Sequence, residues 1–187
     1  MKNNFSFHIL VMFIAFSNSL FANSDTLIHK NATWKYYDHV NTTIPNWKLL
    51  TYNDSLWASG AGQFGYGDGD EATVIYYGVS AKTKYIAYYF RKKINIANPA
   101  IYDSLRINML CDDGAVIYLN GIEVKRTNLP LTTIGIKTRA LTSINPPTES
   151  QYFPYIISNT NLIAGENIIA VEVHQYSSGN SDLSFDM

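Results

Sequence analysis

The chain has 187 residues, of which 47% are hydrophobic, 14% aromatic and 16% charged, and its formal net charge is -1. This length is enough for one well-buried domain and does not require two. Because no dense basic patch is available to neutralise phosphates, a nucleic-acid partner is not expected. The 14 tyrosines and 9 phenylalanines favour strands over helix bundles, so the composition predicts an all-β protein.

Residues 1–22 are predicted to be a secretory signal peptide. Lys2 supplies an early positive charge, the segment from Phe7 to Phe16 is apolar, and Ala22 is a small residue at the expected cleavage point. The apolar segment is shorter than the ~20 residues of a membrane span, and a retained anchor is the alternative. No cysteine follows it, so a lipoprotein is not expected.

This leader predicts a secreted, periplasmic or cell-surface protein whose mature chain has no membrane span. Residues 23–32 form a polar lead-in, and residues 33–187 form the domain. Cys111 is the only cysteine, which excludes an intrachain disulfide. It alternates in phase with Leu105, Ile107 and Met109, so we expect a buried structural thiol. The stability of such a domain must come from its core or from a bound ion.

Period-two patterning and turn residues divide the domain into short strands. In residues 84–96, Ile86, Tyr88, Phe90, Ile94 and Ile96 share one parity, and Lys92 interrupts that face, which predicts a bulge or an edge. Other strands are expected around residues 33–38, 72–77, 105–111, 115–119, 122–126, 134–141, 152–157, 168–174 and 183–185. No helix of three turns is expected. The pattern is typical of an antiparallel β-sandwich or jelly roll.

The strongest local pattern is Asn120-Gly121 between two alternating segments. A type I′ hairpin turn needs positive φ at both central residues, which asparagine and glycine tolerate. Just before this hairpin lies Asp112-Asp113-Gly114. One interpretation is a turn in which aspartate caps the backbone and glycine supplies positive φ. The other is a metal site, because carboxylates are hard oxygen ligands suited to calcium.

A second acidic loop runs from Asp68 to Glu71 in a glycine-rich segment. Together the two loops make Asp112, Asp113, Asp70 and Glu71 the candidate metal ligands, with Ca²⁺ as the candidate cofactor. Asp182 and Asp186, near the C-terminus, would complete a site if the termini of the chain pair.

Three tryptophans, Trp34, Trp47 and Trp57, lie in the N-terminal third. They either fill the core or offer exposed rings that stack on a sugar. Trp57 and Tyr66 flank the glycine-rich segment and are the preferred platform. His174 is expected to face outward, with Glu172, from the strand whose Ile169, Val171 and Val173 face the core. The candidate ligand-binding residues are therefore Trp57, Tyr66, Asp68, Asp70 and His174.

The sequence contains few residues in patterns that are typical of a catalytic site. His29, His39 and His174 are widely spaced and form no zinc motif. No Gly-x-Ser-x-Gly nucleophile elbow occurs. A glycosidase needs two carboxyls at a set separation, which a sequence cannot exclude. We therefore predict no catalytic residue and no enzyme activity of this chain's own.

Several segments, taken in order, resemble the galactose-binding-domain-like jelly rolls, including the sugar-binding domain of β-galactosidases and β-glucuronidases. The matching segments cover nearly all of the domain: 52–57 with 64–67, 89–92, 112–121, 165–174 and 182–185. The resemblance implies an eight- or nine-strand sandwich attached to secreted multidomain proteins, beside hydrolases or surface anchors. Some members bind sugars through their end loops and hold a structural calcium, and others serve as spacers.

The hairpin is also similar to part of the protective-antigen-type lectin domain. In that family an Asp-Asp pair holds a calcium ion that coordinates a sugar, a role that the resemblance implies for Asp112 and Asp113. The rest of the chain fits that family less well.

The sequence thus predicts a secreted, non-catalytic carbohydrate-binding module, with calcium as an aid. Its expected partners are a cell-wall or extracellular polysaccharide and a neighbouring catalytic or surface domain. Two alternatives remain open: a structural or adhesion module without a small ligand, and a hydrolase with an unrecognised site.

Overall fold

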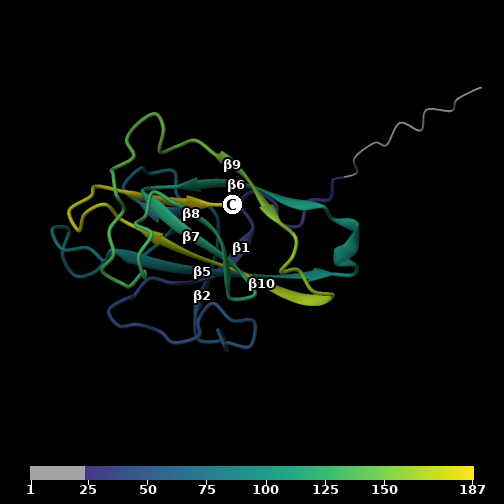
Figure 1. Ribbon diagram of the computed structural model, residues 1–187. Coiled ribbons are helices and arrows are strands. Elements are labelled where there is room, and N and C mark those ends of the chain that lie inside the picture. The colour runs from purple at the N-terminus through teal and green to yellow at the C-terminus, as the bar shows by residue number, and fades with distance from the viewer. Residues whose placement is uncertain (1–23) are drawn as a thin grey trace, which may run out of the picture.

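The computed structural model describes residues 24–187, so the predicted signal peptide, residues 1–22, lies outside the described residues. Two β-sheets pack face to face, and one 3-10 turn, η1 (Pro99–Ile101), is the helical element of the described chain (Figure 1). The predicted all-β sandwich is confirmed. No helix between residues 24 and 187 is long and apolar enough to cross a membrane.

The larger sheet has six strands in the order β2-β1-β5-β10-β7-β8. Their bounds are β1 (Thr33–Tyr37), β2 (Ala58–Ala61), β5 (Ala87–Ile96), β7 (Gly114–Leu119), β8 (Ile122–Thr127) and β10 (Gly165–His174). The central pair, β5 and β10, is antiparallel over ten consecutive residue pairs. The predicted bulge near Lys92 is therefore absent, whereas the alternative, an edge, is present, because β1 pairs with β5 only as far as Arg91. The Lys92 amine donates a hydrogen bond to the Thr33 carbonyl at 2.8 Å.

The smaller sheet has five strands in the order β4-β3-β11-β6-β9. They are β3 (Phe64–Tyr66), β4 (Thr73–Val74), β6 (Ser104–Cys111), β9 (Phe153–Ser158) and β11 (Leu183–Asp186). The chain crosses between the sheets repeatedly, and two of these crossings, between β6 and β7 and between β10 and β11, adjoin the candidate site described below.

The strand predicted over residues 134–141 is wrong, because residues 128–152 are irregular. Their backbone groups bond to other loops instead of a neighbouring strand. Ala140 donates to the Gln175 carbonyl at 3.1 Å, and Leu141 donates to the Asn128 carbonyl at 2.9 Å. The first part of this segment, which contains Leu129 and Ala140, packs on the outer face of the larger sheet.

The main core fills the space between the two sheets. At its centre the Phe90 ring lies 4.3 Å from Phe185 and 5.1 Å from Phe64, measured between ring centroids. The predicted parity of β5 is confirmed, because Tyr88, Phe90, Ile94 and Ile96 are all buried here. Cys111 is buried as predicted, and burial raises the pKa of its thiol.

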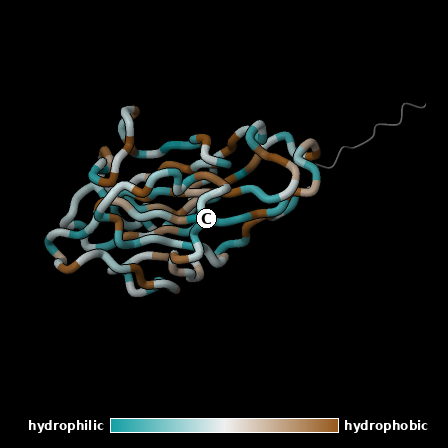
Figure 2. Tube along the Cα trace, turned by 90° about the horizontal axis from the view of Figure 1, so that it is seen from below, coloured by the Kyte–Doolittle hydropathy of each residue, from teal (hydrophilic) through white to brown (hydrophobic). Residues whose placement is uncertain are grey.

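A second core lies on the outer face of the larger sheet, beneath the loop over residues 38–57. There Trp47 stacks on Tyr89 at 4.3 Å, and Trp57 lies 6.2 Å from Trp47. The Arg91 side chain is fully buried beside them and pairs with Asp54 at 2.7 Å. Figure 2 shows hydrophobic positions (brown) in the loops that flank the strands as well as in the strands. The outer face of the larger sheet, which would meet solvent in a simple two-sheet sandwich, is therefore covered by loops.

The predicted hairpin between β7 and β8 is confirmed. Asn120 and Gly121 have φ values of 52° and 87°, as the turn requires. The Asn120 amide also donates to the Asn161 carbonyl at 2.8 Å and accepts from the Ile168 nitrogen at 2.9 Å. The turn is therefore tied to β10 as well as to its own strands.

Candidate functional site

One end of the sandwich gathers five connecting segments, and we call it the loop end: residues 67–72, 75–86, 112–113, 128–152 and 175–182. Lys84 donates its backbone hydrogen bond to the Ser178 carbonyl at 2.9 Å, and Ala140 donates to Gln175 at 3.1 Å. The Tyr176 nitrogen donates to the Asp113 carboxylate at 2.6 Å. The loop end holds a group of carboxylates and a pocket.

Asp113 is fully buried and anchors two neighbouring segments, 128–152 and 175–182. Its Oδ1 accepts from the Ile144 nitrogen at 2.7 Å. Its Oδ2 accepts from the Tyr176 nitrogen at 2.6 Å and from the Asn180 amide at 2.6 Å. Both carboxylate oxygens of this predicted metal ligand therefore already accept hydrogen bonds from the protein. The neighbouring Gly114 does not have positive φ, and a Cβ there would lie 2.9 Å from the Asn128 carbonyl, so close approach explains the glycine.

Asp112 is also buried, with 2% of its surface exposed, but its surroundings differ. Within the described residues its Oδ1 has no hydrogen-bond partner. Burial, followed by the neighbouring Asp113 and the charges of Asp182 and Glu149, raises the pKa of Asp112 to about 9. Without a cation these surroundings favour the protonated carboxyl at neutral pH.

Three further carboxylates, which we call the acidic cluster, lie close together at the loop end: Asp68, Glu149 and Asp182. One oxygen from each lies within 4.8 Å of the others. Ser184 links the cluster to Asp112, because its hydroxyl donates to Asp68 Oδ2 at 2.9 Å and its carbonyl accepts from the Asp112 nitrogen at 2.9 Å. By its donor chemistry, such a cluster is able to bind a metal ion.

Asp70 and Glu71, also predicted as metal ligands, lie in the same loop as Asp68, with Asp70 exposed and Glu71 half-buried. With Asp68 they form a second set of oxygens within 4.8 Å. Glu71 accepts from the nitrogens of Asp68 and Gly69 at 2.9 and 3.0 Å. Asp70 accepts from the Gln63 amide at 3.2 Å. These contacts fold the loop onto itself.

The pairing of β11 with β6 brings the charge of Asp182 close to Asp112, and the structure adds Glu149. Glu149 was missed because it lies in an irregular segment with no strand pattern to place it. Asp186, the other terminal candidate, is buried in β11 and accepts from the Tyr152 hydroxyl at 2.6 Å and from the Asn31 nitrogen at 3.0 Å. Its carboxylate therefore holds the N-terminal segment and the loop before β9.

The two rings predicted as an exposed platform are interior. Trp57 is 6% exposed and belongs to the second core. Tyr66 is 4% exposed and belongs to the main core, where burial raises the pKa of its hydroxyl. Their expected exposure is wrong because the loop over residues 38–57 folds back on the sheet and β3 lies inside the sandwich.

His174 and Glu172 share the outer face of β10, as predicted, but that face is covered. His174 is fully buried, and its Nδ1 lies 2.7 Å from the Thr138 carbonyl. Its Nε2 lies 3.3 Å from Glu172 Oε2. Glu172 accepts in turn from the Tyr118 hydroxyl at 2.5 Å. In this structure His174 is therefore closed off from a ligand at the surface.

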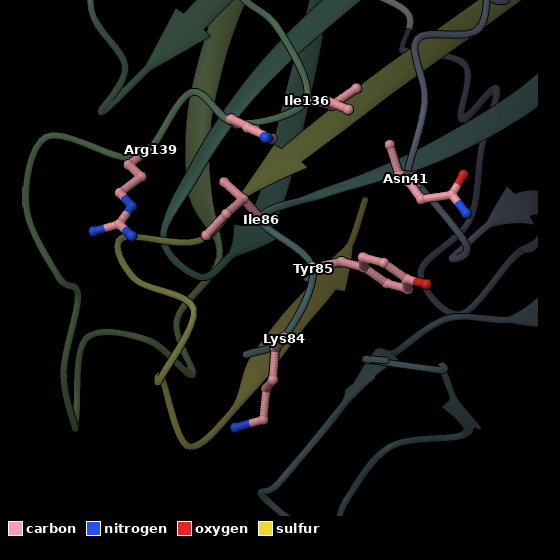
Figure 3. Close-up of a pocket in the computed structure, with 8 residues that line it drawn as sticks. Asn41, Lys84, Tyr85, Ile86, Ile136 and Arg139 are labelled. Carbon is pink, nitrogen blue, oxygen red and sulfur yellow. The ribbon is translucent and has the colours of Figure 1, made fainter. Parts of the chain in front are cut away.

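A pocket of about 380 Å³ opens between two segments of the loop end, 75–86 and 128–152, and the adjoining loop over residues 38–57. In Figure 3 its walls carry Asn41, Tyr85 and Ile136, with Arg139 at one side. Lys84 extends away from Asn41 and Ile136 (Figure 3), and its amine donates to the Asn180 carbonyl. The volume is near the lower end of small-molecule sites.

Beside this pocket lie three aromatic rings, His39, Tyr76 and Tyr85, which we call the ring row. His39 and Tyr76 stack at 4.6 Å, and Tyr76 meets Tyr85 edge-on at 6.1 Å. The His39 side chain is 57% exposed and Tyr76 is 37% exposed. A second hollow of about 430 Å³ is lined by Asp38 and residues 74–78. The ring row was not predicted from the sequence, because His39 comes from a different loop than Tyr76 and Tyr85.

No protein-family model and no curated protein matches the sequence. Among solved structures, a β-glucuronidase from glycoside hydrolase family 2 matches 81% of this chain and 15% of its own, with 16% identity and a TM-score of 0.46. The Bacteroides uniformis β-glucuronidase matches 79% of this chain and 14% of its own, with 16% identity and a TM-score of 0.47. A Bacteroides vulgatus β-glycosidase matches 84% and 20%, with 15% identity and a TM-score of 0.44.

The chain therefore spans a fifth or less of the length of these three enzymes. The described part of the chain is an all-β sandwich.

Proposed function

We propose that the chain is a non-catalytic accessory module that binds carbohydrate at its loop end, through the ring row and the adjoining pocket. The ring row carries this proposal. Aromatic rings stack on the apolar face of a sugar, and amide or guanidinium groups bind its hydroxyls. Tyr76 and His39 offer exposed rings, and Asn41 and Arg139 supply polar groups beside them.

The polar groups around the two hollows support a binding role over a catalytic one. A glycosidase uses two carboxyl groups about 5–9.5 Å apart. Among the described residues that line the hollows, Asp38 is the one carboxylate. Its Oδ2 accepts from the Tyr76 nitrogen at 2.7 Å and so holds the ring row in place.

The module would act outside the cell, attached to a larger hydrolytic or surface protein, on a cell-wall or extracellular polysaccharide. The predicted leader and the resemblance of the sequence to secreted sugar-binding domains support this setting. Calcium would assist from the acidic cluster. Residues 175–182 connect the acidic cluster to the pocket. They contain Asp182, a member of the cluster, and they accept hydrogen bonds from Lys84, which lines the pocket.

Binding to a panel of polysaccharides tests this proposal, measured with and without a chelator. Tyr76→Ala is expected to weaken binding at least about 10-fold, which corresponds to the stacking of one ring, and to leave the melting temperature nearly unchanged. Tyr102→Ala is the matched control, because Tyr102 lies at the opposite end of the sandwich, between β5 and β6. Equal losses in both variants, or no binding at millimolar sugar, would contradict the proposal.

A structural or adhesion module is the second candidate. Val79 and Leu131, both at the loop end, are 96% and 95% exposed, and such apolar side chains suit contact with a neighbouring protein surface. Binding to no glycan, with Val79→Ser and Leu131→Ser abolishing attachment to a neighbouring domain, would favour this role. Turnover of chromogenic glycosides by the purified chain would instead favour a hydrolase.

A further inference from the structure

The pocket at the loop end carries charge of one sign. Three of its eight lining residues, Lys84, Lys137 and Arg139, are cationic, and none is acidic. The whole chain has a formal net charge of -1, so a general excess of basic residues does not account for this charge. A concave surface lined by one sign of charge attracts ligands of the opposite sign. The pocket therefore favours an anionic group.

Lys137 and Arg139 are available to bind such a group. Both residues are exposed, and within the described part of the chain neither side chain forms an ion pair. The other arginines differ, because the guanidinium groups of Arg91, Arg106 and Arg126 each donate to a side chain of the protein. Among the arginines that the structure describes, Arg139 is thus the one whose donors are not engaged by another side chain.

The backbone beneath these two cations is fixed. The Thr138 nitrogen donates to the Gly135 carbonyl at 2.8 Å, and the Gly135 nitrogen donates to the Thr138 hydroxyl oxygen at 2.9 Å. The Thr138 carbonyl lies 2.7 Å from Nδ1 of the buried His174 in β10. Since Lys137 and Arg139 flank Thr138, their backbone is held in place before a ligand arrives, which lowers the entropy cost of binding.

Lys84 adds a positive charge that has no carboxylate partner among the described residues. It is 8% exposed, and its amine donates to the Asn180 carbonyl. The centroids of two neutral rings, Tyr66 and Tyr77, lie 5.3 and 5.5 Å from the amine. Buried charges are normally paired with an opposite charge. Because the amine is engaged by Asn180, Lys84 acts on the pocket through its charge and not by contact.

We propose that the pocket binds the anionic substituent of an acidic polysaccharide, a carboxylate or a sulfate ester, while the ring row stacks on the adjoining sugar. Arg139 and Lys137 bind the anionic group directly. The inference rests on the proposed sugar binding and names the class of sugar that the same site takes.

The donor chemistry of Arg139 favours an anionic group over a sugar hydroxyl. A guanidinium donates two parallel hydrogen bonds to a pair of anionic oxygens, and such bonds are about twice as strong as those between neutral groups. Asp38, the carboxylate of the second hollow, does not pair with Arg139. It is engaged by the Tyr76 nitrogen at 2.7 Å and by the His39 ring at 3.6 Å. Because Arg139 and Lys137 are at the surface, salt should weaken their attraction for the ligand.

Matched pairs of polymers test the class of sugar: polygalacturonate with its methyl ester for the carboxylate, and carrageenan with agarose for the sulfate ester. Calorimetry on the full chain in EDTA measures binding without divalent cations that could bridge acidic groups. We expect the anionic member of a pair to bind at least about 10-fold tighter than its neutral partner. We expect this preference to shrink as NaCl is raised from about 50 to about 500 mM. The pair with the larger preference identifies the anionic group.

The outcomes separate this inference from the proposed function. Equal binding of both members of each pair would overturn the anionic class and leave sugar binding intact. No binding of any of the polymers at millimolar sugar would overturn both. Tyr76→Ala is expected to weaken both members of the preferred pair alike, because stacking on the ring does not depend on the charge of the substituent.

Arg139→Gln removes the charge and keeps a long polar side chain. We expect at least about 10-fold weaker binding of the anionic polymer and unchanged binding of its neutral partner. The melting temperature should stay the same, because Arg139 is exposed. Lys137→Gln is expected to give a smaller loss, because an ammonium group is a flexible point charge. If Arg139→Gln weakens the binding of both polymers equally, the guanidinium binds hydroxyl groups and the anionic class is overturned.

Arg106→Gln is the matched control. It changes the net charge by the same amount, but it removes an exposed arginine from β6 in the smaller sheet, close to η1 and away from the loop end. We expect it to leave the binding of both polymers unchanged. If it weakens the anionic polymer as much as Arg139→Gln does, the attraction is spread over the surface and the pocket is not the site.

Discussion

The two faces of the larger sheet bury aromatic side chains by different means. The inner face meets the other sheet, and its residues, such as Phe90 and Val171, are apolar and fully buried. The outer face meets irregular loops, and it buries Tyr89, Glu172 and His174 together with tryptophans. Alternation along a strand therefore says which residues share a face, but not whether that face is covered.

Phe90→Ala is expected to give the largest effect. It removes the ring that packs against Phe64 and Phe185 at the centre of the main core. Two opposed sheets cannot collapse into the space, so we expect a loss of about 3–5 kcal/mol in the free energy of unfolding. Urea unfolding measures it, with Ile94→Val, at about 1 kcal/mol, as the milder control in the same core.

Trp57→Ala is expected to cost less, about 2–3 kcal/mol, although tryptophan is larger. Its ring packs on Trp47 and Tyr89 beneath a loop, and a loop relaxes into a cavity more easily than a sheet does. The same urea experiment applies. A loss below about 1 kcal/mol would mean that the second core is not part of the cooperative fold.

Asp54→Ala tests the polar part of the outer face. It leaves the buried Arg91 guanidinium without its carboxylate partner, but the carbonyls of Leu49 and Tyr52 still accept from it. We therefore expect a loss of about 2 kcal/mol, below the usual cost of breaking a fully buried pair. Glu123→Ala, which breaks the more exposed pair with Arg126, should cost under about 1 kcal/mol in the same unfolding assay.

Of these changes, raising the pH should have the smallest effect on the free energy of unfolding near neutral pH. It should involve buried tyrosines on both faces of the larger sheet. Burial raises the pKa of Tyr66 and Tyr88 in the main core and of Tyr89 and Tyr118 on the outer face. An unfolded tyrosine titrates near about pH 10. The stability that these groups contribute is thus complete below about pH 10 and is lost as the pH rises towards their folded values.

Tyrosinate absorbance during a pH titration checks this. We expect the four buried hydroxyls to ionise only as the protein unfolds, after the exposed tyrosines. If Tyr89→Phe and Tyr118→Phe remove the delayed phase but Tyr66→Phe does not, the outer face alone controls alkaline unfolding.

The elements that were predictable depend on local chemistry. The Asn120-Gly121 turn and the parity of β5 follow from backbone preference and alternation, and both are confirmed. Burial of Trp57 was one of two alternatives left open by the sequence, and the choice between them, like the burial of His174, depends on where distant loops fold. The same holds for the ring row and for Glu149, whose neighbours Asp68 and Asp182 are far away in the sequence. Asp112 and Asp113 are adjacent residues of the same type, so the sequence cannot distinguish them. They differ only in the hydrogen-bond partners that the folded chain gives them.

The three hydrogen bonds to Asp113 have a consequence for how the loop end responds to mutation. They join residues 144, 176 and 180 to the crossing between the sheets through one side chain. Groups that share a partner are energetically coupled, and the effects of changing them do not add. Double-mutant cycles between the segments 128–152 and 175–182 should therefore give coupling energies of about 0.5–3 kcal/mol, and natural variation in one of these loops should be matched by variation in the other.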